Sequence, residues 1–452
     1  MGGAIGDLKI VDALLSKEHK RVYQEKLTTA EEAVKLIKSF DHVLLAHCVG
    51  EPKALITAMV NNYKNYENVK VHSMVRLGPV DITAPEMQGH FIGEPMFSGG
   101  NSRLALKEGR AEFIPMFFHE VPKNIREKKL PVDVILVQLS PPDENGYCSL
   151  GTSVDYTLQG IKTAKTVLAQ INRNMPRTYG DSFVHINEFT KIIEADEPLY
   201  EVPSIEPSET EKKIGEYCAS LVEDGSTLQL GIGGIPDAVM LFLEHKKDLG
   251  IHSEMIADGT LKLFEKGVIT NKYKNFDKGK MTVTFLMGTK KLYNFANNNP
   301  AVQLMPVDYI NHPAVVMKQH KMVSINSAIE VDFQGQVNAE AVGKNQFSGV
   351  GGQVDFIRGV SMGKDGKAII AMPSVTIKKD GSMISKIIPA IEKWAPITTS
   401  RNDIDYVVTE YGIAELKAKT LPERARNLIN IAHPKVRDEL IAAFKERFLV
   451  KF

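Results

Sequence analysis

The chain has 452 residues, of which 55 are Lys or Arg and 55 are Asp or Glu, so its formal net charge is zero. A hydrophobic fraction of 43% with 24% charged residues is typical of a globular protein and excludes disorder as its main state. The balanced charge argues against a general nucleic-acid binder, because such proteins carry a basic excess. No apolar run reaches about 18 residues, so we expect no membrane span.

The amino-terminal sequence and the cysteines indicate a cytoplasmic protein. The first fifteen residues lack a basic start, a long apolar core and a cleavage site, so we expect no secretory signal. Cys48, Cys148 and Cys218 are odd in number and far apart, which argues against disulfides and structural zinc. The twelve histidines show no metal-binding spacing, so no metal site is expected.

Short apolar runs alternate along the chain with amphipathic stretches. The runs predict buried strands at residues 42–46, 132–139, 226–230, 282–286 and 368–371. Residues 29–40 and 236–247 predict helices between them. Continuous apolar strands separated by helices favour an α/β fold with largely parallel sheets.

A proline-rich acidic segment, residues 194–211, reads as a linker and places a boundary near residue 200. We therefore expect an amino-terminal domain over 1–200 and a carboxyl-terminal domain over 201–452. In each half a predicted strand ends near glycine and a proline then opens a helix, at Pro52 and at Pro236. This internal repeat predicts two related α/β units with the site in the cleft between them.

A glycine-rich turn, Gly231-Ile-Gly233-Gly234, follows one predicted strand and opens a helix. Glycines there let backbone N–H groups approach an anionic ligand. Glu254 ends the next predicted strand, over 249–255, and a helix is predicted over 261–266. This pattern is similar to a dinucleotide fingerprint, so an NAD-dependent oxidoreductase is one hypothesis, although Pro236 replaces the third glycine. The alternatives are a tight turn without a ligand and, for Glu254, a surface carboxylate or helix cap.

A second glycine cluster contains Gly349, Gly351 and Gly352. Its backbone donors suit an anion or an oxyanion, whereas the alternative is a simple turn or bulge. Residues 324–340 predict a polar hairpin, and residues 407–416 predict a strand passing into a helix. The turns 364–367 and 378–381 are interpreted mainly as hairpin tips, with phosphate contacts from Lys367 or Lys378 as the alternative.

Taken together, these segments resemble the acetyl-CoA hydrolase/transferase family, in the branch that moves CoA between butyrate or 4-hydroxybutyrate and acetate. The carboxyl-terminal half carries the resemblance in GIGGIPDAV (231–239), GIHSEMIADG (250–259), MGTKKLYNFANNNP (287–300), INHP (310–313), SINSAIEVDFQGQVNAE (324–340), FSGVGGQVDFIRG (347–359) and VVTEYGIAEL (407–416). The amino-terminal half adds FSGGNSR (97–103), GRAEFIP (109–115) and SPPDENGYCSLG (140–151).

The resemblance implies two CoA-transferase-type open α/β domains with the active site in the interdomain cleft. It implies ping-pong transfer through a glutamyl-CoA thioester, with Glu254 as nucleophile and the Gly351 amide as oxyanion donor. The substrate- and CoA-binding residues that it implies are Gly231, Gly233, Gly234, Asn311, Gly349 and Gly352, with Lys367 and Lys378 as further phosphate contacts.

The expected substrates are acyl-CoA thioesters and short-chain carboxylates, with no tightly bound cofactor, no metal, no nucleic acid and no membrane partner. The resemblance also implies a homodimer or a higher homo-oligomer. A hydrolase of the same family is the main alternative, because access of water to the intermediate would turn transfer into hydrolysis. A CoA-binding regulator without catalytic activity is another alternative.

Overall fold

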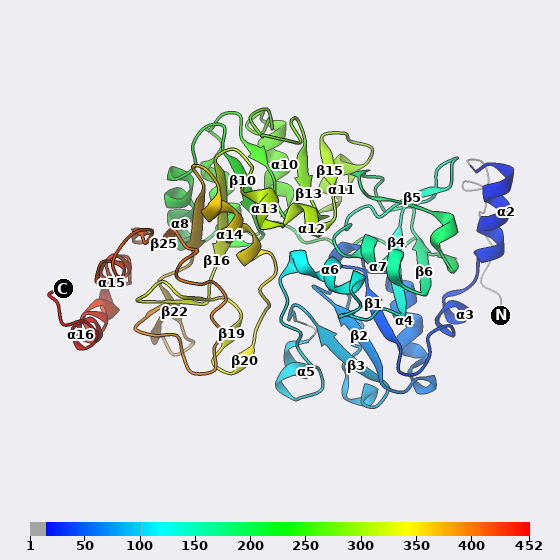
Figure 1. Ribbon diagram of the computed structural model, residues 1–452, viewed down its shortest axis with the longest axis horizontal. Coiled ribbons are helices and arrows are strands. Elements are labelled where there is room, and N and C mark those ends of the chain that lie inside the picture. The colour runs from blue at the N-terminus through cyan, green and yellow to red at the C-terminus, as the bar shows by residue number, and fades with distance from the viewer. Residues whose placement is uncertain (1–14, 101) are drawn as a thin grey trace. The chain divides into compact units, whose positions relative to one another are not determined.

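The computed structural model describes residues 15–100 and 102–452, and the chain forms two compact units (Figure 1). Unit 1 contains the described residues up to Ile114, together with Glu120–Glu201 and Thr284–Asp308. Unit 2 contains Pro115–His119, Val202–Val283 and Tyr309–Phe452. Residues 1–14 and Asn101 lie outside the described residues. The prediction that the amino-terminal sequence is no secretory signal concerns this undescribed stretch. The domain boundary near residue 200 stays a prediction.

Unit 1 is built on a six-stranded parallel sheet in the order β3-β2-β1-β4-β6-β9. The strands are β1 (His42–Leu45), β2 (Val69–Ser73), β3 (Phe91–Pro95), β4 (Val134–Leu139), β6 (Thr166–Ile171) and β9 (Lys191–Glu194). The helices of this unit include α2 (Lys17–Lys26), α3 (Ala30–Val34), α4 (Lys53–Asn61), α5 (Arg103–Lys107), α6 (Val121–Arg126), α7 (Thr157–Thr163) and α11 (Lys290–Ala296). The shorter strands include β5 (Tyr147–Ser149), β7 (Tyr179–Gly180), β8 (Phe183–His185), β14 (Phe285–Leu286) and β15 (Val302–Leu304).

Helices cover both faces of this sheet. Val43 and Leu45 of β1 are buried in one core with residues of α3 and α4. Leu44 points to the other face, where Gly160 of α7 packs so closely that a Cβ would lie 2.7 Å from the Leu44 side chain. Burial on both faces explains why the strands read as continuous apolar runs.

Unit 2 is built on a second six-stranded sheet in the order β11-β10-β16-β21-β25-β26, parallel except for β26. These strands are β10 (Thr227–Leu230), β11 (Gly250–Ile251), β16 (Met322–Ser327), β21 (Lys367–Ala371), β25 (Tyr406–Thr409) and β26 (Gly412–Glu415). The shorter strands include β12 (Met255–Ile256), β13 (Met281–Val283), β17 (Glu330–Asp332), β18 (Val337–Asn338), β19 (Ala341–Val342), β20 (Asn345–Gln346), β22 (Val375–Ile377), β23 (Met383–Ser385) and β24 (Ile387–Ile388).

The helices of unit 2 include α8 (Glu209–Ser220), α9 (Gly234–Phe242), α10 (Asp258–Glu265), α13 (Pro313–Val316), α14 (Gln353–Met362), α15 (Leu421–Asn430) and α16 (Arg437–Arg447). Helix α8 begins with a capping box, in which Ser208 and Glu211 satisfy each other's backbone N–H groups. It packs on α9, while α14 packs on α13, β16 and β21. The α/β prediction with largely parallel sheets is confirmed. In the part of the chain described, no helix is long and apolar enough to span a membrane.

Several local predictions differ from the structure. The strand expected over 249–255 is wrong, because β11 ends at Ile251 and β12 begins at Met255. The helix expected after β25 is instead β26, which pairs antiparallel with it. Residues 364–367 connect α14 to β21, so they form no hairpin tip. Only β17 and β18 form the hairpin expected over 324–340, since β16 belongs to the parallel sheet.

The turn at 378–381 is confirmed as a hairpin tip between β22 and β23. The helix expected over 29–40 is shorter than predicted, ending at Val34, and α9 begins at Gly234 and ends at Phe242. Helix ends are the least certain part of a pattern-based prediction, because capping contacts decide them.

Candidate active site

Glu254 lies in the bend between β11 and β12, in unit 2, with its side chain half-buried. The pairing of β11 with β10 ends at Ile251, before the bend. Ser253 N donates to Thr282 O at 3.1 Å, and the Ser253 hydroxyl donates to Leu230 O at 3.2 Å. Leu230 is the last residue of β10, so these bonds hold the Glu254 segment beside the start of the glycine-rich turn.

His252, two residues before Glu254, is fully buried and joins two segments of the site. Its Nε2 lies 2.8 Å from Ile310 O, and its Nδ1 lies 3.3 Å from Gln319 Nε2. A carbonyl only accepts, so Nε2 carries the hydrogen and Nδ1 accepts from the amide. Burial, with a smaller effect of the Lys274 charge, lowers the pKa of His252 to about 3. His252 is therefore uncharged, and its hydrogen bond links the Glu254 segment to the segment that holds Asn311.

Lys274 also stabilises the chain next to this bend. Its buried Nζ donates to Ile251 O, Lys280 O and Thr282 Oγ1, each at 2.8 Å. Three acceptors match the three hydrogens of an ammonium group. Burial lowers the pKa of Lys274 to about 7. One side chain thus ties the end of β11, just before Glu254, to residues 280–282 at the start of β13.

Asn311 and Gly352 contact the Glu254 carboxylate. Asn311 Nδ2 donates to Glu254 Oε2 at 2.8 Å. A Cβ on Gly352 would overlap that oxygen and the Asn311 amide nitrogen, so only glycine leaves room for this arrangement. Gly352 is the N-cap of α14, whose free N–H groups and dipole favour negative charge at this position.

The glycine loop leads directly into this contact. Gly351 has a φ of 52°, a left-handed conformation that glycine adopts without strain, and its carbonyl accepts from Phe118 N at 3.3 Å. Gly349, two residues earlier, is buried. The structure therefore brings Glu254, Asn311 and Gly352 into contact, with Gly351 adjacent in the chain.

Two further residues are linked to Asn311 by hydrogen bonds, and the sequence analysis identified neither of them. Asp355, on the first turn of α14, lies with its Oδ2 3.4 Å from Asn311 Nδ2. His119 Nδ1 lies 2.7 Å from Asp355 Oδ1, and His119 N donates to Oδ2 at 3.1 Å. Asp355 belongs to the motif FSGVGGQVDFIRG, so the sequence could have indicated it. His119 lies 236 residues from Asp355, and no sequence pattern marks it.

The turn Gly231–Gly234 has two parts with different environments. Gly233 has a φ of 107° and caps α9, which explains why it is glycine. A Cβ on Gly234 would strike the Glu211 carboxylate of the α8 capping box, so packing accounts for that glycine. A Cβ on Gly231 would meet nothing within 4 Å, which leaves open space beside the end of β10.

The two lysines expected to contact phosphate lie in different parts of unit 2. Lys367 Nζ donates to Leu221 O and Glu223 Oε1, each at 2.8 Å. It begins β21, whereas Gly231 and Glu254 follow the carboxyl ends of parallel strands, so Lys367 lies at the opposite edge of the sheet. Together with Lys321, Lys367 holds the pKa of Glu223 at about 2. Lys378 lies at the tip of the β22–β23 hairpin.

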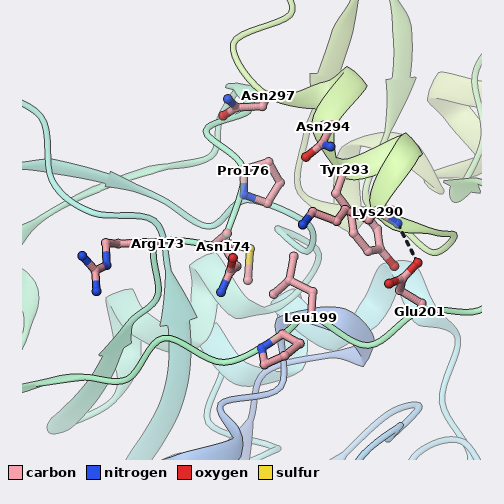
Figure 2. Close-up of a pocket in the computed structure, with 11 residues that line it drawn as sticks. Arg173, Asn174, Pro176, Leu199, Glu201, Lys290, Tyr293, Asn294 and Asn297 are labelled. Carbon is pink, nitrogen blue, oxygen red and sulfur yellow. Dashed lines mark hydrogen bonds between the residues drawn. The ribbon is translucent and has the colours of Figure 1, made fainter.

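Unit 1 contains a separate cavity of about 340 Å³ that the sequence did not indicate (Figure 2). Its lining is Arg173, Asn174, Met175, Pro176, Pro198, Leu199, Glu201, Lys290, Tyr293, Asn294 and Asn297. Lys290 N donates to Glu201 Oε2 at 2.9 Å across one side of the cavity (Figure 2). Four of the lining residues come from the motif MGTKKLYNFANNNP, which gives that motif a place in the fold.

A cluster of His42, His72 and Glu94 forms on adjacent strands of the unit 1 sheet. His42 Nδ1 lies 3.0 Å from His72 Nε2, and His72 Nδ1 lies 3.1 Å from Glu94 Oε2. The three residues have metal-ligand atoms within 4.8 Å of one another, although their sequence spacing shows no metal pattern. Lys70 Nζ lies 2.6 Å from Glu94 Oε1, so the carboxylate already has a cationic partner. The bonds from His72 and Lys70 outweigh burial and lower the pKa of Glu94 to about 2.

Comparison with known proteins gives consistent matches over nearly the whole chain. Residues 12–205 match the acetyl-CoA hydrolase/transferase N-terminal domain, and residues 288–444 match the acetyl-CoA hydrolase/transferase C-terminal domain. The 4-hydroxybutyrate coenzyme A transferase of Clostridium kluyveri is 55% identical, over 95% of this chain and all of that protein.

Two further relatives agree. The butyryl-CoA:acetate CoA-transferase of Anaerostipes caccae is 37% identical, over 93% of this chain and 96% of that protein. The crystal structure of 4-hydroxybutyrate CoA-transferase from Porphyromonas gingivalis superimposes with a TM-score of 0.82 at 41% identity, covering 95% of this chain and all of that chain.

Proposed function

Because the chain belongs to the acetyl-CoA hydrolase/transferase family, we propose that it is a CoA-transferase that moves CoA between short-chain carboxylic acids. The proposed donors are butyryl-CoA or 4-hydroxybutyryl-CoA, with acetate as the acceptor, in line with the names of the relatives. CoA thioesters are substrates in this scheme, which needs no tightly bound cofactor and no hydride transfer. The family assignment leaves the nicotinamide hypothesis without support.

The first half of the reaction loads CoA onto the enzyme. A Glu254 carboxylate oxygen attacks the thioester carbonyl, the C–S bond breaks and CoA leaves as its thiolate, which gives a mixed anhydride. The thiolate then attacks the glutamyl carbonyl of that anhydride. The first carboxylic acid leaves as its carboxylate, and a glutamyl-CoA thioester remains.

The second half runs in the opposite direction with a different acid. The acceptor carboxylate attacks the glutamyl thioester and releases the CoA thiolate, which then attacks the acceptor's carbonyl in the new anhydride. The new acyl-CoA leaves, and the Glu254 carboxylate is regenerated. Carboxylates and thiolates are the only nucleophiles and leaving groups, so no proton needs to be moved, and one difficult transfer becomes a series of easier covalent steps.

The observation that carries this proposal is the position of the Glu254 carboxylate, 2.8 Å from Asn311 Nδ2 at the amino end of α14. The Asn311 N–H stabilises negative charge on the glutamyl oxygen as charge develops there. The backbone N–H groups of the Gly351–Gly352 turn are the proposed donors to the tetrahedral intermediates. One such donor contributes about 3 kcal/mol, or about 100-fold in rate, in other enzymes.

The test is incubation of the purified protein with butyryl-CoA, with and without acetate, followed by mass spectrometry of the acyl-CoA species. We expect acetyl-CoA to appear only with acetate and free CoA to stay low. Free CoA that accumulates equally without acetate would identify a hydrolase instead.

The nucleophile is tested in the same preparation. Protein treated with butyryl-CoA alone, quenched and digested, should carry a CoA adduct on the peptide that contains Glu254. The Glu254→Ala variant is the control, since it offers no carboxylate. Turnover by that variant would contradict the assignment of Glu254.

A further inference from the structure

We propose that Asp355 and His119 are positioning residues that fix the Asn311 amide and, through it, the reacting carboxylate of Glu254. The inference rests on the proposed function, because it concerns the same carboxylate. Neither residue needs to touch a substrate for this role. Each acts through a hydrogen bond to the next group in the series His119–Asp355–Asn311–Glu254.

One nitrogen of Asn311 faces two carboxylates. Asn311 Nδ2 lies 2.8 Å from Glu254 Oε2 and 3.4 Å from Asp355 Oδ2, so its two hydrogens point to two different acceptors. Asn311 is fully buried, and its Oδ1 has no hydrogen-bond partner among the residues that the structure describes. Ionised carboxylates only accept hydrogen bonds. A rotation of the amide by 180° would therefore place Oδ1 against two negative oxygens.

Asp355 itself is held rigidly. It is 1% exposed, and it receives His119 Nδ1–H at 2.7 Å and the His119 backbone N–H at 3.1 Å. Its place on the first turn of α14 favours the negative charge further. The His119 ring also meets the edge of His312, the residue after Asn311, with 5.2 Å between ring centroids. His119 thus contacts both the carboxylate behind Asn311 and the segment that carries Asn311.

For the reaction, the consequence is that the Asn311 amide keeps a single orientation. With Asp355 in place, the Asn311 N–H points at the glutamyl oxygen in the carboxylate, the anhydride and the thioester alike. Without an acceptor at position 355, the amide gains a second orientation in which its oxygen opposes Glu254. A group misplaced by about 1 Å in an active site lowers the rate by about 100-fold.

The test compares Asp355→Asn with two variants of His119. Asp355→Asn keeps the shape but replaces one acceptor by a donor, so we expect kcat to fall about 100-fold with KM values nearly unchanged. His119→Ala removes the side-chain donor and should lower kcat by about tenfold. His119→Asn carries an amide N–H close to the position of Nδ1, so it should restore most of the loss.

The readout that separates positioning from stability is the rate at which CoA becomes attached to Glu254 in a single turnover. Asp405→Asn is the matched control. Asp405 is also a buried carboxylate of unit 2, accepting from Ala368 N and from Lys417 Nζ, each at 2.9 Å. We expect Asp405→Asn to lower the melting temperature but to leave the rate of adduct formation unchanged.

Three outcomes would overturn the inference. Adduct formation by Asp355→Asn at the wild-type rate would show that Asp355 serves stability alone. Equal kcat values for His119→Ala and His119→Asn would show that the donated hydrogen bond has no part, and this comparison stands even if Asp355→Asn does not fold. Absence of any adduct in the wild-type protein would overturn the proposed function, and this inference with it.

Discussion

Replacement of Gly352 by Ala introduces one methyl group at the point where the candidate site is most crowded. The new Cβ would overlap Glu254 Oε2 and Asn311 Nδ2 and would lie 3.1 Å from Glu254 Cδ. Relief of that overlap needs a displacement of the carboxylate by about 1 Å, which corresponds to a rate loss of about 100-fold, or about 2.7 kcal/mol in activation free energy.

The same substitution should cost little in folding. The φ of Gly352 is −95°, which any L-residue adopts, so no backbone strain arises. The remaining cost is that of Ala instead of Gly at an N-cap, about 1 kcal/mol. Gly352→Ala should therefore lose most of its activity while its melting temperature falls by only a few degrees.

The assay measures kcat and KM for butyryl-CoA and acetate together with thermal melting of the same samples. Gly99→Ala is the control, because a Cβ at Gly99 would meet nothing within 4 Å. We expect the control to match the wild-type protein in both measurements. A folded Gly352→Ala protein with kcat within about threefold of wild type would refute the reasoning, since the Glu254 carboxylate would then not need its position beside α14.

Glu254→Ala should lower kcat by at least about 10⁴-fold while CoA binding, measured by calorimetry, persists. The pKa of Glu94 is about 2 in the folded protein against an ordinary 4.5, so its stabilisation is present above pH 4.5 and is lost as pH falls toward 2. That loss is about 3 kcal/mol, and Glu94→Gln should remove it from denaturant unfolding curves measured across this range. Lys274, with a pKa lowered to about 7 from 10.5, binds fewer protons folded than unfolded between these values. Stability should therefore rise between pH 7 and 10 by up to about 1.4 kcal/mol per pH unit, and Lys274→Met should abolish that slope.

The α/β class was predictable because burial on both faces of a parallel sheet leaves a direct trace in the sequence. The apolar runs that became β1, β4, β10 and β21 are continuous for this reason. The break between β11 and β12 was not predictable. Residues 249–255 read as one strand, but the pairing with β10 ends at Ile251 and the chain bends at Glu254 before β12.

Residue type and local order drew attention to Glu254 and to the Gly349–Gly352 loop, whereas Asn311 and the nucleophilic role of Glu254 came from the family resemblance. A glycine loop before a helix and a glutamate after a strand are local patterns that chemistry restricts to few residue types. The sequence does not show that these residues contact one another, and only the tertiary structure does. Lys367 illustrates the limit, because a lysine in a turn looks the same in sequence whether it faces a ligand or, as here, pairs with Glu223.

The sequence alone determined the family, the layered α/β architecture and the residue types that can carry acyl transfer, because each depends on short-range patterns. The tertiary structure alone decided the convergence on the Glu254 carboxylate. Asn311 lies 57 residues from Glu254 and 44 from Asp355, and His119 lies 236 residues from Asp355. A hydrogen bond needs its two groups within about 3 Å of each other. The number of residues between them along the chain does not show whether the fold brings them that close.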